Sequence, residues 1–149
     1  MEILEVTENK EQYMDLLLLG DEQESMIEKY LQRGSLYALY DDFDLKTILV
    51  VTKEKDDTCE IKNIATHKMY QGKGYGSAMI KYIIEKYKNK CKILLVGTGE
   101  SEKILVFYEK FGFTYSHTIK DFFINNYDHA LMEDGEQLKD MIYLKFVYK

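Results

Sequence analysis

Residues Glu60–Lys88 organise the chain, and they read E-I-K-N-I-A-T-H-K-M-Y-Q-G-K-G-Y-G-S-A-M-I-K-Y-I-I-E-K-Y-K. The stretch begins with a strand-like run, Ile61–Thr66, and breaks at a basic, glycine-rich turn, Gln71–Ser77. Beyond the turn, apolar residues recur at every third or fourth position, which is typical of the buried face of a helix. These residues are Met79, Ile80, Ile83, Ile84 and Tyr87. The pattern predicts a strand, a turn and a helix in that order.

The turn has the composition of an anion-binding site. The first turn of a helix carries about four N–H groups without partners and roughly half a positive charge. Glycines at positions 72, 74 and 76 would let a bulky phosphate approach the backbone, and Lys73 adds a cation. We therefore predict a pyrophosphate-binding turn. The alternative is a surface turn that only caps the helix.

Three kinds of phosphate-binding turn differ in their spacing. No stretch fits the Walker pattern G-x-x-x-x-G-K-[ST]. The dinucleotide fingerprint would need glycine in place of Ser77 and an acid at the tip of the next strand, but the predicted strand Lys92–Val96 is followed by Gly97–Gly99. The pattern that fits is [QR]-x-x-G-x-[GA], at Gln71–Gly76. This pattern resembles the acetyl-CoA signature of the GNAT family of N-acetyltransferases.

A second motif follows in the order that this family has. The run I-L-V-F-Y-E-K-F-G-F at Ile104–Phe113 resembles the family's helix with [LF]-Y-x-x-x-G-F, within a predicted helix Ser101–Phe111. Gly112 stands where a helix ends in a left-handed residue, and Phe113 opens the next strand. The resemblance is specific over Ile48–Phe113. It implies an α/β (α+β) fold with a mixed, mostly antiparallel sheet of six to seven strands, flanking helices, and parallel strands that splay apart at the cofactor site.

The resemblance also implies how the co-substrate acetyl-CoA is held. In this family the pantetheine arm lies along the central strand, here Ile64–Thr66, and the Ile64 N–H would donate to the thioester oxygen. Many relatives have an asparagine after the next strand. Here Gly97–Gly99 replace it, so the Thr98 hydroxyl would have to supply that contact. The predicted cofactor-binding residues are Ile64, Ala65, Thr66, Gln71, Gly72, Lys73, Gly74, Tyr75, Gly76, Ser77, Thr98 and Tyr108.

Two residues are the predicted catalysts of acetyl transfer to an amine. Tyr108 would protonate the departing thiolate, because a donor with a pKa of about 10 can serve that leaving group. The alternative for Tyr108 is a core aromatic. Glu60 lies on the central strand where one branch of the family has its general base, which contributes about 10²–10⁴-fold. The alternative for Glu60 is an exposed residue at the start of a strand without a catalytic role. The base would then be a water or another carboxylate.

Composition limits the function classes. A chain of 149 residues can bury about 68–70% of its unfolded surface, enough for one domain over residues 1–149. A net charge of −6 argues against nucleic acid as a partner. The longest apolar run is Leu16–Leu19, too short to span a membrane, and no signal peptide is recognisable, so we expect a cytoplasmic protein. Cys59 and Cys91 are expected to be reduced thiols. Three scattered histidines predict no metal site.

The rest of the chain supplies strands and helices around this centre. The predicted strands are 2–6, 35–40, 45–52, 114–123 or beyond, and 137–147; the predicted helices are 8–19 and 22–32. Residues 41–44 are predicted as a hairpin turn and 53–57 as a charged loop.

The acceptor is the least defined part of the prediction. We expect the acceptor to be the amine of a small molecule or of a protein. We expect the enzyme to be a monomer or a homodimer. We predict that acids of the last connection and of the N-terminal helices line one groove and attract a small polycation. These acids are Asp121, Asp128, Glu133, Asp134, Glu136, Asp15, Asp21, Glu22 and Glu24. A solvated surface loop is the alternative for the connection. For the whole chain, the alternatives are an inactive acyl-CoA sensor and a nucleotide-binding α/β protein.

Overall fold

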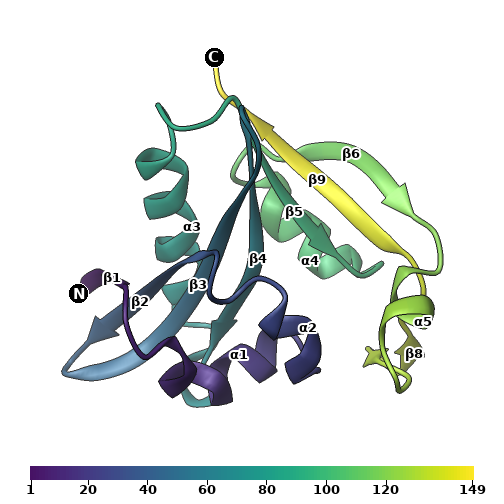
Figure 1. The fold of residues 1–149 in the computed structure, drawn as a ribbon, viewed down its shortest axis with the longest axis horizontal. Coiled ribbons are helices and arrows are strands. Elements are labelled where there is room, and N and C mark those ends of the chain that lie inside the picture. Colours follow the sequence, from purple (N-terminus) through teal and green to yellow (C-terminus); the bar gives the residue numbers. More distant parts are fainter.

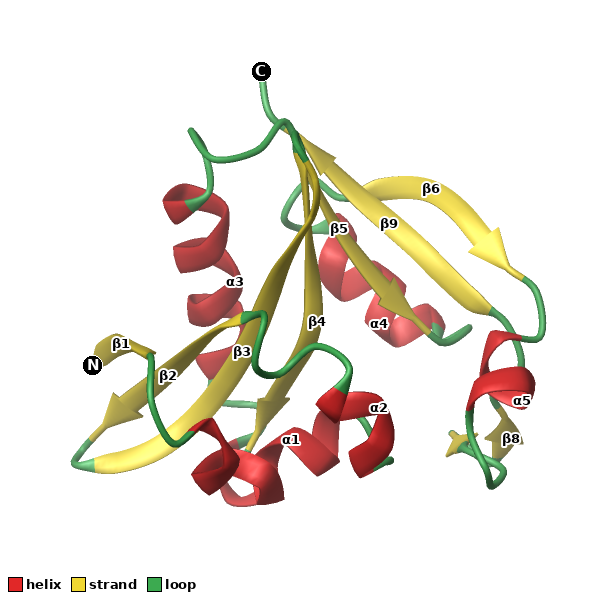
Figure 2. Cartoon of the chain, viewed as in Figure 1, coloured by secondary structure: helices red, strands yellow, loops and turns green.

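The computed structural model describes all 149 residues, Met1–Lys149, and is built on a mixed sheet of seven strands (Figures 1 and 2). The strand order is β1-β2-β3-β4-β5-β9-β6. The strands are β1 (Glu2–Val6), β2 (Ser35–Asp41), β3 (Asp44–Lys55), β4 (Thr58–Thr66), β5 (Ile93–Thr98), β6 (Thr114–Ile119) and β9 (Met141–Val147). A small separate hairpin pairs β7 (Met132–Glu133) with β8 (Glu136–Gln137).

The helices are short except for two. They are η1 (Lys10–Tyr13), α1 (Met14–Gly20), α2 (Glu24–Glu28), η2 (Lys68–Tyr70), α3 (Tyr75–Lys86), α4 (Glu102–Glu109) and α5 (Phe122–Asn126). Figure 1 shows α1 and α2 beneath the arm formed by β2, β3 and β4, and α5 at the end of the arm formed by β9 and β6. None of these helices combines the length and the apolar character that crossing a membrane requires.

The sheet divides into two arms between β4 and β5. These two strands form the parallel pair of the sheet, and they pair only from Thr58/Ile93 to Ile61/Val96. Beyond Ile61, β4 continues to Thr66 while paired with β3 alone. The two arms therefore open from a common base (Figure 2). This confirms the predicted mixed sheet with parallel strands that splay.

Each face of the sheet carries its own core cluster. On one face, Met79, Ile80 and Ile83 of α3 are fully buried against β3, β4 and β5. On the other, Leu17 of α1 and Ile27 of α2 are fully buried against the first arm. Full burial of such a side chain stabilises the fold by about 1.5–3 kcal/mol. The apolar spacing that predicted α3 therefore matches the residues that hold it on the sheet.

Several predicted boundaries were wrong in the second half and around β3. Residues 53–55 continue β3, because they pair with β4 across a tight turn at 56–57. The predicted strand 114–123 ends at Ile119, since Asp121 adopts a left-handed backbone (φ 55°) and starts α5. Residue Gln137 belongs to β8, so the last strand begins at Met141. The hairpin turn at 41–44 is confirmed, with φ of 51° and 66° at Asp42 and Phe43.

Candidate active site

The glycine turn between β4 and α3 has an open, preformed backbone. Gly72 and Gly74 have φ of 78° and 89°, and a Cβ at either would meet nothing within 4 Å. The first helical hydrogen bond runs from the Ala78 N–H to the Gly74 carbonyl. The N–H groups of residues 75–77 therefore have no helical partner. Lys73 is exposed beside them. This is the geometry that an anion such as a phosphate requires.

A buried lysine contacts the aromatic residues on either side of this turn. This contact was not predicted from the sequence. The side chain of Lys46 is almost fully buried, and its Nζ lies 3.3 Å from the centroid of the Tyr70 ring. The same Nζ is 5.7 Å from the Tyr75 ring, whose hydroxyl donates to Asp41 Oδ2 over 2.9 Å. On the other side, Gln71 Nε2 donates to the Thr66 carbonyl over 3.1 Å. These contacts tie the turn and the start of α3 to β2, to β3 and to the end of β4.

The free edge of β4 begins where β5 leaves it. Residues 64–66 pair with β3 but have no strand on their other side. The Ala65 side chain is buried against α1, and the Thr66 hydroxyl lies 2.9 Å from that of Thr47. The Ala65 side chain is therefore not available to a ligand, and the Thr66 hydroxyl is already paired. An extended ligand could add to this edge as a further strand.

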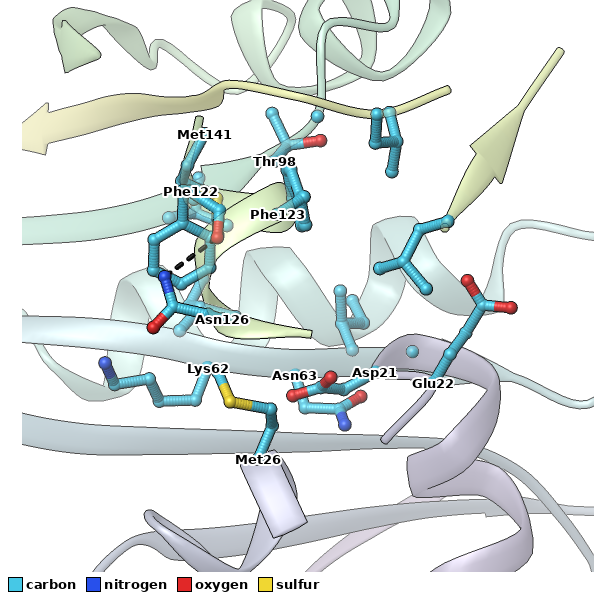
Figure 3. Close-up of a pocket in the computed structure, with 18 of the residues that line it drawn as sticks. Asp21, Glu22, Met26, Lys62, Asn63, Thr98, Phe122, Phe123, Asn126 and Met141 are labelled. Atoms are coloured by element: carbon cyan, nitrogen blue, oxygen red, sulfur yellow. Dashed lines mark hydrogen bonds between the residues drawn. The ribbon is translucent and has the colours of Figure 1, made fainter. Parts of the chain in front are cut away.

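A cavity of about 510 Å³ lies between the two arms (Figure 3). It is lined by the α1–α2 segment, β4, β5, α4, α5, the connection after α5 and the start of β9. Four predicted site residues line it: Glu60, Ile64, Thr98 and Tyr108. The glycine turn, Ala65 and Thr66 lie outside it, farther along the first arm. The predicted residues therefore fall into two adjoining groups.

Glu60 reaches the cavity from a distorted part of β4. Ile61 and Asn63 pair with the consecutive residues Val51 and Val50, so Lys62 is an extra residue in a β-bulge. Bulges commonly re-aim side chains beside active sites. Glu60 is only 7% exposed, so it is not an exposed residue at a strand start.

The surroundings of Glu60 suit a general base. Lys62 Nζ lies 3.0 Å from Glu60 Oε2, and the Tyr143 hydroxyl donates to the same oxygen over 3.5 Å. Burial raises the pKa of Glu60, and this outweighs the lowering by Lys62. A carboxylate with a raised pKa in a cavity accepts protons more readily than an exposed one.

Tyr108 faces Glu60's cavity from the second arm, on α4. Its ring packs edge-on against Phe107 and Phe113, at centroid distances of 5.1 and 5.4 Å. The side chain is 4% exposed and still lines the cavity. Burial alone raises the pKa of its hydroxyl, which therefore stays protonated at neutral pH. The residue is a core aromatic whose side chain also lines the cavity.

Thr98 lines the cavity from the end of β5, between two glycines that have a packing role. A Cβ at Gly97 would lie 2.7 Å from Met141 Sδ, and one at Gly99 would collide with the Leu138 side chain. At Gly97 and Gly99 a larger residue such as asparagine would collide with the residues that pack against the end of β5.

A carboxylate at the α1–α2 junction was predicted only as one of many acids. Asp21 lines the cavity and accepts hydrogen bonds from the Tyr30 hydroxyl at 3.0 Å and the Tyr127 hydroxyl at 2.6 Å. Asn63 Nδ2 donates to the Tyr30 hydroxyl at 3.1 Å and to the Leu17 carbonyl at 2.9 Å. In Figure 3 Asp21 lies beside Asn63, below Phe122 and Asn126. The aromatic residues of the last connection were the only sequence signal for this group.

The predicted acidic groove was wrong in most of its members. Among those acids, only Asp21, Glu22 and Glu133 line the cavity, which also contains Lys29, Arg33 and Lys62. Asp121 starts α5, and the Asp128 carboxylate is exposed and contacts His129. The aromatic part of the prediction was better, because Phe122, Phe123 and Tyr127 do line the cavity. Nowhere do three or more His, Cys, Asp or Glu side chains gather as a metal would require.

Comparisons with known proteins agree with this architecture. A family model described as an acetyltransferase (GNAT) domain matches residues 32–115. The chain is 35% identical over 139 residues to YvbK, an uncharacterised N-acetyltransferase of Bacillus subtilis (strain 168), with 92% of this chain and 90% of that protein covered.

Two solved structures are also similar. One is a GNAT family acetyltransferase from Elizabethkingia anophelis with acetyl-CoA bound, at 36% identity and a TM-score of 0.93, covering 98% of this chain and 97% of that one. The other is a Bacillus subtilis acetyltransferase in complex with CoA, at 33% identity and a TM-score of 0.92, covering 99% of each chain. The chain therefore belongs to the GNAT family of acetyltransferases and is an N-acetyltransferase.

Proposed function

We propose that the enzyme transfers the acetyl group of acetyl-CoA directly to a primary amine, of a small cationic molecule or of a protein or peptide, within a ternary complex. The observation that carries the proposal is the cavity between β4 and β5. It brings a carboxylate with a raised pKa, Glu60, and a protonated buried phenol, Tyr108, to one space from opposite arms. Two similar proteins hold acetyl-CoA or CoA, which supports the donor.

The residues that would hold acetyl-CoA are those of the turn and of the free strand edge. The unpaired N–H groups of residues 75–77, with Lys73, would bind the pyrophosphate. Main-chain groups of Ile64–Thr66 would pair with the pantetheine arm, which leaves the Ile64 N–H to donate to the thioester oxygen. Gln71 and Thr98 complete the predicted set, from either end of this path.

Two of the proton transfers in the reaction are assigned to side chains, one to Glu60 and one to Tyr108. Glu60 takes a proton from the acceptor's ammonium group, directly or through a water, and leaves the amine lone pair free. The amine nitrogen attacks the thioester carbonyl carbon; the C–N bond forms and the C–S bond breaks. Tyr108 then donates its proton to the departing thiolate sulfur. The attacking nitrogen gives up its remaining extra proton to solvent, and solvent returns a proton to the Tyr108 oxygen.

The competing function is an inactive acyl-CoA sensor of the same fold. It would need the turn and the strand edge but no proton donor. The burial of the Tyr108 hydroxyl at the cavity, with Glu60 on the opposite arm, favours catalysis.

Initial rates at varied concentrations of acetyl-CoA and amine test the direct transfer. We expect double-reciprocal lines that intersect, because both substrates must be bound before chemistry. Parallel lines would indicate an acetylated enzyme and contradict the ternary complex.

A further inference from the structure

Asp21 is a carboxylate in the wall of the cavity that has no ion-pair partner. Two tyrosine hydroxyls donate to it, that of Tyr127 to Oδ1 and that of Tyr30 to Oδ2. The residue is half-buried, and burial raises the pKa of its carboxyl group. The charge of Lys29 lowers the pKa of Asp21, but Lys29 is exposed and its effect is the smallest among the causes of the shift. The carboxylate is thus oriented and partly desolvated, with its charge uncompensated by the protein.

The other charges at the cavity are largely compensated. Arg33 lies 2.9 Å from Glu54, and Lys62 bridges Glu54 at 3.9 Å and Glu60 at 3.0 Å. Two cations and two carboxylates therefore form one neutral network at the Glu60 end. At the other end, Asp21 is accompanied by Glu22 and Glu133, against Lys29 alone. The uncompensated charge of the cavity is negative and centred on Asp21.

The space between these ends is apolar and aromatic. Phe122, Phe123, Met141 and Met26 line it. Asp21 is linked through the Tyr30 hydroxyl to Asn63, which is three residues beyond Glu60 on β4. Asp21 and Glu60 therefore line different parts of the same cavity, one beside Asn63 and the other earlier on β4.

We propose that Asp21 binds a second cationic group of the acceptor, and that the acceptor is a small diamine with an apolar chain between its ammonium groups. The inference rests on the proposed function, because Glu60 receives the amine that is acetylated. Carboxylates and aromatic rings together bind an ammonium group through charge and cation–π attraction.

The closed side of the cavity favours a small molecule over a protein tail. Besides the Tyr127 contact, the Asp128 N–H donates to Gln23 Oε1 at 2.9 Å, so the last connection is joined to the α1–α2 segment at two points. The cavity volume of about 510 Å³ is within the usual range for small-molecule sites.

Calorimetric titration of the CoA-saturated protein with linear diamines of increasing length, and with monoamines of matched length, tests the site without turnover. We expect one chain length to bind about tenfold or more tightly than its monoamine, because a second charged contact forms. This comparison in the unaltered protein needs no variant. Equal affinities for diamines and monoamines would overturn the proposal.

Two variants assign the effect to Asp21. Asp21→Asn keeps an acceptor oxygen for one tyrosine, and its NH2 group can donate to the other hydroxyl, so the protein should still bind CoA normally while the diamine preference disappears. Asp128→Asn removes the same charge from an exposed position outside the cavity and should leave the preference intact. A preference that survives Asp21→Asn would overturn the assignment.

Turnover separates this inference from the proposed function. If amines are acetylated without any preference for diamines, the acetyltransferase mechanism stands and the role of Asp21 falls. If a diamine binds through Asp21 but no acetylated product forms, the cation site stands and the proposed reaction falls.

Discussion

Replacing Glu60 by glutamine removes the proposed base with little change of shape. Glutamine can still accept a hydrogen bond from Tyr143 but cannot take up a proton at neutral pH. Because Glu60 is 7% exposed, water can replace it only in part. We expect kcat/KM for the amine to fall about 10²–10⁴-fold, the usual contribution of a general base. The dissociation constant of CoA should change less than about twofold, since the proposed CoA contacts lie on the turn and the strand edge.

The pH dependence of kcat/KM is a second, independent test of Glu60 as the base. Burial raises the pKa of Glu60, so the unaltered enzyme should gain kcat/KM as pH rises through that raised pKa, and the variant should lack this limb. The folded chain binds this proton more tightly than the unfolded chain does. The resulting stability is therefore present at low pH and is lost as pH rises through the folded pKa.

At neutral pH the Glu60→Gln variant should be at least as stable as the unaltered protein. Chemical denaturation measures the free energy of unfolding of both.

Glu54→Gln is the matched control for this variant. Glu54 also pairs with Lys62 but does not line the cavity, so its loss should leave kcat/KM within about threefold. A Glu60→Gln enzyme with unchanged kcat/KM and an unchanged pH profile would refute Glu60 as the base and leave water or Asp21 in that role.

Three further substitutions test other parts of the account. Tyr108→Phe should lower kcat about 10²-fold with little change in the CoA dissociation constant, as rapid kinetics and calorimetry can separate; an unchanged kcat would return Tyr108 to a packing role. Gly74→Glu should weaken CoA binding at least about tenfold, because its side chain would occupy the phosphate position, whereas Gly135→Glu, at a similar φ of 81° with equally open surroundings, should bind CoA normally. Gly20→Ala should destabilise the fold by about 1–3 kcal/mol in urea titrations, since its Cβ would collide with Asn63 Oδ1 and lie 3.1 Å from the Ile64 carbonyl; unchanged stability would show that β4 can shift there freely.

The first arm and its turn could be predicted from local patterns. The glycines of residues 72–76 and the apolar face of residues 79–87 are short-range signals, and the structure places a turn and α3 there. The left-handed conformation of Gly112 at the end of α4 could also be predicted from the residues next to it in the sequence. These features depend on backbone sterics and helix periodicity, which a single sequence records.

The acceptor side could not be predicted in the same way. The Tyr127–Asp21 hydrogen bond joins residues 106 positions apart, and no local pattern encodes it. The bulge at Lys62 depends on the pairing with β3, and it lies two residues from Glu60. A run such as Phe122–Phe123 suits a strand or a helix, and the backbone of Asp121 decides between them.

Product stoichiometry tests whether the enzyme transfers acetyl groups from acetyl-CoA to an amine. The unaltered protein is incubated with acetyl-CoA and a panel of amines, while free CoA thiol and acetylated amine are quantified together by thiol titration and mass spectrometry. We expect one acetylated amine for each thiol released with at least one amine, and formation of both products about 10²–10⁴-fold more slowly in Glu60→Gln. Tight acetyl-CoA binding with no acetylated amine from any member of the panel, or thiol released without amide formation, would contradict acetyl transfer to an amine.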